Sequence, residues 1–447
     1  MQNKDLNIGF LPIARATFDM ELAAQMTAQV QAQLTQNDFT VFAPEALVTS
    51  IDEVRATLPI LTAQPLDLLV VLQASFADST MVMEAAAGVD APLLLWALPE
   101  ARVGGRLRLN SLCGINLAAH ALRRAGYRYD YLYAEPYQLE AIEKVEALAR
   151  AGRVSHLLRQ TRIGRIGEHP AGFDTCHVDQ AALREQLGVE VVQVALAPVF
   201  AEMQTANGEA VEAARQATAA RVAGLDALDQ TALNGTLSAY VTLSELATRE
   251  NLKGLAVRCW PEFFTEAGCA ACGALSMLSD ELTPCSCEAD VNGTITQLIL
   301  QWFSGEPAFL TDLVSVDDES DGLVLWHCGL APLSMADPTV QPEGTVHSNR
   351  KLPLLMQFPL KPGVVTVARL SEATGQFRLV IGKAEMLQAP MNFTGTSGVV
   401  CFERPAAAVL DTIMREGLEH HFSLTYGDHT NALAALAEML KLPVLYL

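Results

Sequence analysis

The first third of the chain alternates between short apolar runs and amphipathic segments, and this alternation limits the folds that it can adopt. Five runs have the length and composition of strands: Leu6–Leu11, Phe39–Phe42, Leu66–Leu72, Pro92–Trp96 and Tyr129–Leu132. Helical patterns lie between them at Glu21–Leu34, Ile51–Leu61 and Ser111–Ala125. Strands that alternate with helices form a parallel sheet covered on both faces. We therefore expect an N-terminal, Rossmann-like α/β domain over residues 1–160.

The same alternation starts again near Thr161. The expected strands are Arg162–Ile166, Val189–Leu196, Gly254–Cys259 and Pro284–Cys287. The expected helices are Thr231–Thr248, Gly268–Leu278 and Val291–Phe303. This pattern predicts a central, Rossmann-like α/β domain over residues 161–330, and open α/β sheets bind their ligands at the carboxyl ends of the strands.

After residue 330 the pattern changes to β-rich runs separated by Gly, Pro and Ser. These runs are Leu352–Phe358, Val364–Arg369, Phe377–Ile381 and Val399–Phe402. A helix at Asn431–Leu440 and a strand at Val444–Leu447 end the chain. We expect residues 331–447 to form a C-terminal antiparallel, barrel-like domain.

Composition excludes several classes of function. A chain of 447 residues, half of them hydrophobic and 18% charged, has enough apolar surface for several folded domains. Its net charge of -21 repels nucleic acids and anionic membranes. The N-terminus lacks a basic secretion signal, and the apolar runs are too short to span a membrane. With nine cysteines at apolar positions, which suits reduced thiols, we expect a cytoplasmic protein.

Three short motifs place polar groups at the ends of hydrophobic runs. They are RCWPEFF at 258–264, CEADVNG at 287–293 and WHCG at 326–329. They carry Glu262, Glu288, Asp290 and His327, and His420-His421 offers two more histidines. Buried carboxylates are costly unless a cation or a partner holds them. Oxygen ligands with a histidine suit Mn²⁺ or Mg²⁺, and the histidine favours Mn²⁺.

Each of these residues also has a purely structural interpretation. Glu262 fits the N-terminus of a helix, Asp290 fits an N-cap, and His327 fits a hydrogen-bonded core histidine. The cysteine pairs 269/272 and 285/287 resemble a zinc site. The second pair has only one intervening residue, however, so we expect these cysteines to pack in the core.

Motifs along most of the chain resemble the L-fucose isomerase/L-arabinose isomerase superfamily. WALPE at 96–100 and NSLCG at 110–114 resemble its first domain, and RIGRIGEHPAGFD at 162–174 resembles the start of its second. The three motifs above resemble its metal and catalytic core. The ending HHFSLTYGDHTNALAALAEMLKLPVLYL at 420–447 resembles its C-terminal domain. The motifs also occur in the family's order.

The resemblance implies an aldose–ketose isomerase with a divalent metal, usually Mn²⁺, bound by two carboxylates and a histidine. By motif, the ligands are Glu262, Asp290 and His421, and the two carboxylates are also the catalytic residues. The alternates Glu288, His327 and His420 stay open. The family also implies a homo-oligomer, a trimer or a hexamer, with sites near subunit interfaces.

The chemistry suits these residue types. The isomerisation moves a proton between C1 and C2 through an enediol, which requires positioned carboxylates and stabilisation of a developing oxyanion. We expect substrate contacts from six residues: Arg15, Glu100, Asn110, Arg165, Trp260 and Trp326. The sugar is a pentose, a 6-deoxyhexose or a modified sugar, and a cation near the cleft would suit a phosphorylated or sulfonated one. A sugar epimerase and a non-catalytic sugar-binding protein are the alternatives.

Overall fold

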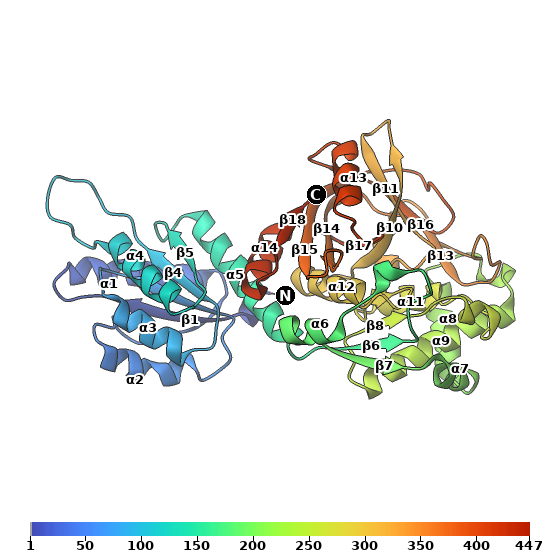
Figure 1. Cartoon of the computed structure of the whole chain (residues 1–447), viewed down its shortest axis with the longest axis horizontal. Helices are drawn as coiled ribbons and strands as arrows, with labels where there is room; N and C mark the ends of the chain where they lie inside the picture. The colour runs from blue at the N-terminus through green and yellow to red at the C-terminus, as the bar shows by residue number, and fades with distance from the viewer. Residues whose placement is uncertain (1) are drawn as a thin grey trace. The chain divides into compact units, whose positions relative to one another are not determined.

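The computed structural model describes residues 2–447, which form two compact units (Figure 1). The first unit ends at His156 and the second begins at Leu157, so the division falls inside helix α5 (Leu139–Leu158). Within the described residues, no helix is both long enough and apolar enough to cross a membrane. Each unit has its own sheets and is described by itself.

A five-stranded parallel sheet forms the centre of the first unit. Its strand order is β2-β1-β3-β4-β5. The strands are β1 (Asn7–Ile13), β2 (Thr40–Phe42), β3 (Leu68–Gln73), β4 (Leu93–Ala97) and β5 (Asp130–Tyr133). The helices are α1 (Met20–Gln36), α2 (Ile51–Leu61), α3 (Ser79–Gly88), α4 (Ser111–Arg124) and α5. The inner strands β3 and β4 are apolar and buried along their length, as parallel strands between two helical layers must be.

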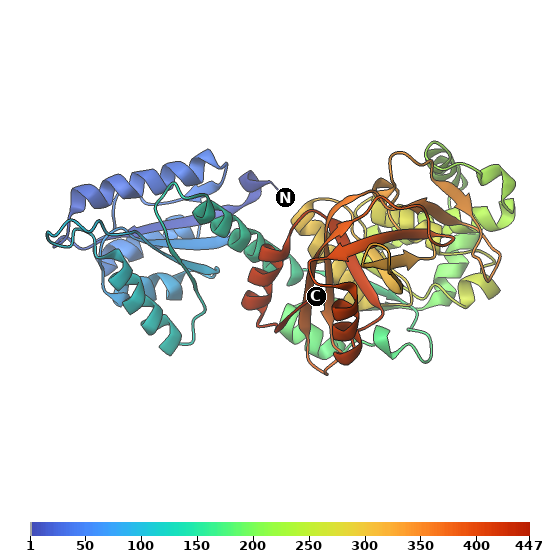
Figure 2. The same ribbon diagram turned by 90° about the horizontal axis from the view of Figure 1, so that it is seen from above.

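Helices cover both faces of this sheet. Apolar side chains of α2, α3 and α4 pack into one core against β1, β3 and β4. Helix α1 lies on the opposite face (Figure 2). Asp19, Ser50 and Asp78 each accept a hydrogen bond from a backbone N–H in the first turn of α1, α2 and α3, and so fix where these helices begin.

The second unit opens with another parallel sheet, of order β7-β6-β8-β9. The strands are β6 (Arg162–Ile166), β7 (Glu190–Val194), β8 (Gly254–Val257) and β9 (Cys285–Ser286). The helices are α6 (Gln180–Leu187), α7 (Leu196–Gln204), α8 (Gly208–Ala219), α9 (Gln230–Arg249), α10 (Glu262–Thr265), α11 (Cys272–Asp280) and α12 (Val291–Ser304).

Six antiparallel strands then close into a barrel, in the cyclic order β16-β11-β10-β17-β14-β15. They are β10 (Phe309–Asp317), β11 (Gly322–His327), β14 (Gly363–Ser371), β15 (Arg378–Met386), β16 (Thr396–Phe402) and β17 (His421–Tyr426). Strands β12 (Glu343–Thr345), β13 (Leu355–Pro359) and β18 (Val444–Tyr446) extend this sheet, and helices α13 (Ala406–Arg415) and α14 (Thr430–Leu440) complete the chain. The predicted fold class, two parallel α/β sheets followed by an antiparallel barrel, is confirmed.

Helix α12 joins the parallel sheet to the barrel. It packs against β8 and β9 on one side and against β14 and β17 on the other (Figure 1). Nearly every residue of α12 is buried, including the polar Asn292, Thr294, Thr296 and Gln297. The two sheets therefore share one hydrophobic core, which fixes the carboxyl ends of the parallel strands against one end of the barrel.

A tight contact of α5 gives a first prediction. A side chain at Gly152 would overlap the backbone carbonyl oxygen of Asp67, which a rigid strand holds in place. We expect Gly152→Ala to lower the free energy of unfolding by about 1–3 kcal/mol, measured by urea denaturation, although alanine normally favours a helix. Gly208→Ala in α8, where a methyl group meets open space, is the matched control and should cost nothing. Equal stability of the two variants would contradict the packing described.

Candidate active site

The candidate site begins at the carboxyl ends of β8 and β9. Strand β9 ends at Ser286, and the next four residues turn sharply before α12 begins at Val291. Glu288 and Ala289 both adopt left-handed backbone conformations, with φ of 57° and 55°. This turn directs the Glu288 side chain back toward the residues that follow β8, where the indole Nε1 of Trp260 donates to Glu288 Oε1 at 3.0 Å.

The barrel contributes the histidines and a second carboxylate. Strand register sets Asp312 of β10 directly opposite His421, the first residue of β17, so their side chains lie on the same face. Asp312 also pairs with Trp326 of β11, next to His327 at the end of that strand. Three neighbouring strands thus bring Asp312, His327 and His421 to one end of the barrel.

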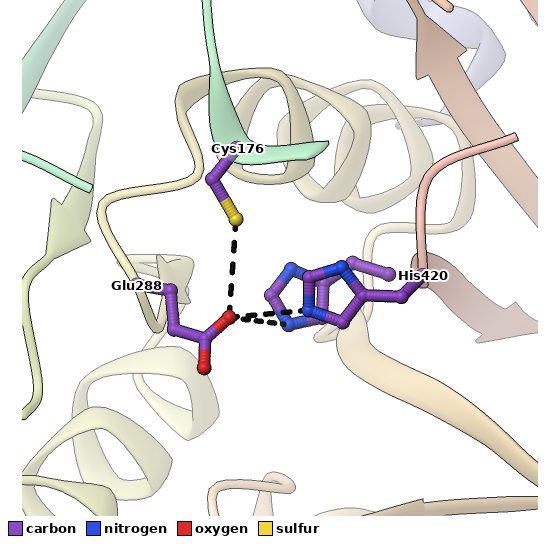
Figure 3. A group of neighbouring side chains, drawn as sticks. Cys176, Glu288 and His420 are labelled. Atoms are coloured by element: carbon purple, nitrogen blue, oxygen red, sulfur yellow. Dashed lines mark hydrogen bonds and ion pairs between the residues drawn. The ribbon is translucent and has the colours of Figure 1, made fainter. Parts of the chain in front are cut away.

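The two groups of residues meet at Glu288 and His421. The Glu288 Oε2 atom lies 3.1 Å from His420 Nε2 and 3.8 Å from His421 Nε2. The Asp312 Oδ1 atom lies 3.5 Å from the same His421 Nε2. Figure 3 shows Cys176 above Glu288, with its Sγ 3.9 Å from Oε2, and His420 beside it. Two carboxylates therefore converge on one imidazole nitrogen.

A buried ion pair fixes the orientation of His421. The fully buried Asp290 carboxylate binds the fully buried Arg369 guanidinium through two contacts, at 2.5 and 3.1 Å. It also accepts from the backbone N–H of Gly293 at 2.9 Å and contacts His421 Nδ1 at 2.9 Å. Because Asp290 holds the proton on Nδ1, the lone pair of His421 Nε2 points toward Glu288 and Asp312.

Local charges keep these carboxylates ionised. Burial alone would raise the pKa of Asp290, but the charge of Arg369 and the hydrogen bond to His421 hold that pKa well below its usual range. Burial opposes ionisation of Glu288 too, and the hydrogen bonds to His420 and Trp260 lower its pKa. Both groups are therefore carboxylates at neutral pH.

Cys287 and His327 form the inner wall of the cluster. Cys287 Sγ lies 2.9 Å from His327 Nε2 and 3.5 Å from His421 Nε2. Burial raises the pKa of the Cys287 thiol well above its usual value, so the sulfur is neutral. His327 Nδ1 accepts a hydrogen bond from the backbone N–H of Cys328, which leaves the ring proton on Nε2, facing the sulfur.

The structure separates the predicted ligands. It brings together Asp290, His421 and the three alternates Glu288, His327 and His420. Glu262 is the first residue of α10, and its carboxylate accepts from Arg258 Nε at 2.7 Å. That hydrogen bond is the main reason why the pKa of Glu262 is lowered. Glu262 thus has a local counter-charge in Arg258, and its place among the ligands stays a prediction.

The predicted substrate contacts fall into two groups. In the second unit, Trp260 contacts Glu288, Trp326 stacks on His327 with ring centroids 6.1 Å apart, and the buried Arg165 contacts His169 Nδ1. In the first unit, Arg15 pairs with Asp78, and Glu100 accepts three backbone N–H groups, of Arg108, Leu109 and Asn110. Glu100 and Asn110 line a cavity of about 570 Å³ in that unit.

Asp312 is the member of the cluster that sequence reasoning missed. It stands alone in the apolar run FLTDLV, where a strand pattern hides an isolated acid. Its Oδ1 atom is buried and has no hydrogen-bond partner. A buried oxygen of this kind calls for an explanation, and a cation-binding role is one of the standard ones.

Comparison with known proteins places the chain in a family. A family model described as fucose/sulfoquinovose isomerase, N-terminal domain, matches residues 9–161, and one described as L-fucose isomerase, C-terminal domain, matches residues 326–447. A sulfoquinovose isomerase of Alkalicoccus urumqiensis is 34% identical over 440 residues, which cover 98% of this chain and 99% of the relative. The chain belongs to the fucose/sulfoquinovose isomerase family. Sulfoquinovose isomerases of Priestia aryabhattai and Clostridium sp. (strain MSTE9) are 34% and 32% identical, over 99% and 98% of this chain.

Family membership confirms the predicted enzyme class, a sugar aldose–ketose isomerase. The cluster also fits the divalent cation that the sequence predicted. Glu288, His420, His421 and Cys176 lie close enough together to share one ion, and so do Cys287, His327 and His421. The carboxylate oxygens and the unprotonated His421 Nε2 are donors that suit Mn²⁺. The predicted cytoplasmic location and homo-oligomer remain predictions.

The buried ion pair gives a second prediction. Asp290→Asn leaves the Arg369 charge buried without its main partner, so we expect the free energy of unfolding to fall by about 3–5 kcal/mol, measured by urea denaturation at neutral pH. Asp411→Asn removes the partner of Arg415 in an exposed pair on α13 and should cause no measurable loss. An Asp290→Asn protein as stable as this control would show that the pair does not support the fold.

Proposed function

We propose that this protein is a sulfoquinovose isomerase that requires a divalent cation. It would interconvert sulfoquinovose, a glucose with a sulfonate in place of the 6-hydroxyl group, and the corresponding ketose. The relatives named sulfoquinovose isomerase align over nearly the whole chain. The observation that carries the proposal is the convergence of Glu288 and Asp312 on His421 Nε2, where the buried Asp312 Oδ1 atom accepts no hydrogen bond.

We assign the cation to Glu288, Asp312 and His421, with Mn²⁺ as the expected ion. Glu288 and His421 already lie close enough to share one ion, and the Asp312 carboxylate, 3.5 Å from His421 Nε2, would move toward Glu288 to complete the set. This assignment keeps His421 from the sequence prediction and takes Glu288 from its alternates. Asp312 replaces Asp290, because the Asp290 oxygens already bind Arg369, Gly293 and His421. Glu262 is not included in the proposed ligand set, because it pairs with Arg258. When bound, a divalent cation stabilises the negative charge that develops on the sugar oxygens O1 and O2.

The proton transfer belongs to the carboxylates. Glu288 is ionised and only partly exposed, and Trp260 holds its Oε1 atom, so Oε2 faces the cluster as a base. A base in this position accepts the proton from C2 of the aldose and returns it to C1 of the enediol, while the hydroxyl proton on O2 passes to O1, which gives the ketose. Asp290 is a positioning residue, because it acts only through the orientation of His421.

Aromatic side chains form one wall of the site. The Phe173 ring packs edge-on against Trp260 at 5.3 Å and against His420 at 5.9 Å. Phe173 belongs to the loop after β6, and Thr175 of the same loop hydrogen-bonds His420 Nδ1 at 2.7 Å. An apolar wall excludes water from a reactive enediol and strengthens the nearby charge interactions.

We also propose the division into domains that the sequence predicts: residues 1–160, 161–330 and 331–447.

The assay that tests the function uses sulfoquinovose in D₂O, followed by NMR, with protein stripped by chelator and reloaded with Mn²⁺. We expect the ketose to form, with deuterium entering at C1 or C2, only when Mn²⁺ is present. A C2 epimer in place of the ketose would indicate the epimerase alternative. Absence of any reaction or exchange with Mn²⁺-loaded protein would leave a sugar-binding protein.

The ligand assignment is tested by matched carboxylate variants. Glu288→Gln and Asp312→Asn should each lose bound Mn²⁺ and lower kcat by ~10²-fold or more, because a neutral amide is a poor ligand and no base. Glu262→Gln, the same change outside the cluster, should keep both metal content and kcat near the wild-type values. Loss of Mn²⁺ in Glu262→Gln with retention in Asp312→Asn would restore the ligand set expected from the motifs.

A further inference from the structure

Arg350 is a cation next to the candidate site that has no acidic partner. Its guanidinium lies over the ring faces of Trp260 and Phe264, 4.8 and 5.0 Å from their centroids. Its guanidinium contacts His347 Nε2 at 3.2 Å. Throughout residues 2–447 no carboxylate lies within ion-pair distance of it. Elsewhere in this acidic protein, most arginines pair with Asp or Glu, so the position of Arg350 is unusual.

The contact between Arg350 and His347 places two donors face to face. His347 Nδ1 accepts the backbone N–H groups of Asn349 at 3.3 Å and Arg350 at 3.4 Å. Burial and the charge of Arg350 lower the pKa of His347 to about 4, so the ring is neutral and its single proton lies on Nε2. The Nε2–H group of His347 and the Nη1 group of Arg350 are therefore both donors. An acceptor oxygen placed beside the pair, within reach of both nitrogens, would accept a hydrogen bond from each.

The loop that carries these donors is preorganised. The His347 N–H donates to Leu352 O at 2.9 Å, and the Lys351 N–H donates back to His347 O at 2.7 Å. The buried His347 ring packs edge-on against Phe264, with centroids 5.2 Å apart. Arg350 is held flat against two aromatic rings, so little side-chain entropy remains to be lost when it binds a ligand.

Trp260 connects this pair of donors to the carboxylate cluster. The face of its indole ring carries Arg350, and its Nε1 donates to Glu288 Oε1 at 3.0 Å. One side chain therefore separates the proposed base from an unpaired cation. In a hexose, four carbon–carbon bonds separate C2, where the proton is removed, from C6.

We propose that Arg350 and His347 form the subsite that binds the sulfonate of the substrate and so select a 6-sulfonated over a 6-hydroxylated sugar. This inference rests on the proposed function, because it assigns the C6 end of the same substrate. A sulfonate is a tetrahedral anion with three acceptor oxygens, which suits a guanidinium and an imidazole N–H that converge. Arg350 itself is exposed, so a ligand can reach its guanidinium, and the Trp260 and Phe264 rings on which it lies hold it in place.

The test compares sulfoquinovose with glucose, which has the same ring and no sulfonate, in steady-state assays. We expect Arg350→Gln to raise KM for sulfoquinovose roughly 10–100-fold with a small change in kcat, since the contact is remote from C1 and C2. Turnover of glucose should change little, so the preference for sulfoquinovose should collapse. Arg415→Gln, which removes the same charge from an exposed pair on α13, should leave both sugars unaffected.

Binding without turnover separates this proposal from the proposed function. The methyl glycoside of sulfoquinovose cannot open to an aldehyde, so calorimetric titration with it reports binding alone. A wild-type protein that binds this glycoside while Arg350→Gln and His347→Phe do not would support the subsite even if sulfoquinovose itself is not isomerised. Equal affinity in wild-type and Arg350→Gln protein, or no binding by the wild type, would overturn it. Circular dichroism of each variant establishes that the fold is intact.

Discussion

The buried pair of Asp290 and Arg369 is the interaction on which the candidate site depends. It joins the N-terminus of α12 to strand β14 and, through His421, to strand β17. Removing two charges from water is expensive, and this cost is offset only because the Asp290 oxygens are bound from several sides at once. Two apolar side chains of similar volume could fill the space of Asp290 and Arg369. They could not hold the proton on His421 Nδ1, however, and so could not leave the Nε2 lone pair free to bind a cation.

Helix α12 extends that constraint to the whole second unit. Because it packs against both the parallel sheet and the barrel, it fixes the turn after β9 relative to the ends of β10 and β17. Glu288 comes from that turn, while Asp312 and His421 come from the barrel. The cluster thus combines a residue that follows the carboxyl end of a parallel strand with two residues that pair across neighbouring antiparallel strands. A shift of β10 by one residue would point Asp312 to the opposite face.

The strands of the two parallel sheets were predictable from the sequence, because each is an apolar run of strand length between helical segments. The barrel was predicted only in part: β13, β14, β15 and β16 were expected, whereas β10, β11 and β17 were not. Several helices were not predicted: α3 is built largely of small residues, α5 has a weak apolar periodicity, and α6, α7, α8 and α13 are short. The site was partly predictable. The motifs located His421, Glu288 and Asp290, but Glu262 and Glu288 look alike in sequence. Only the fold shows that Arg258 neutralises Glu262 from four residues away. Asp312 was hidden inside a strand with no motif around it.

Because the cluster takes residues from both the parallel sheet and the barrel, the stability of the second unit would depend on the metal available to it. A cation that bound Glu288 from the sheet side and Asp312 and His421 from the barrel side would link the two layers, and it would bind only the folded state. By mass action, free metal at one hundred times its dissociation constant adds about 2.7 kcal/mol to the stability of the folded form. The second unit would then resist unfolding to a degree set by the supply of metal in its environment.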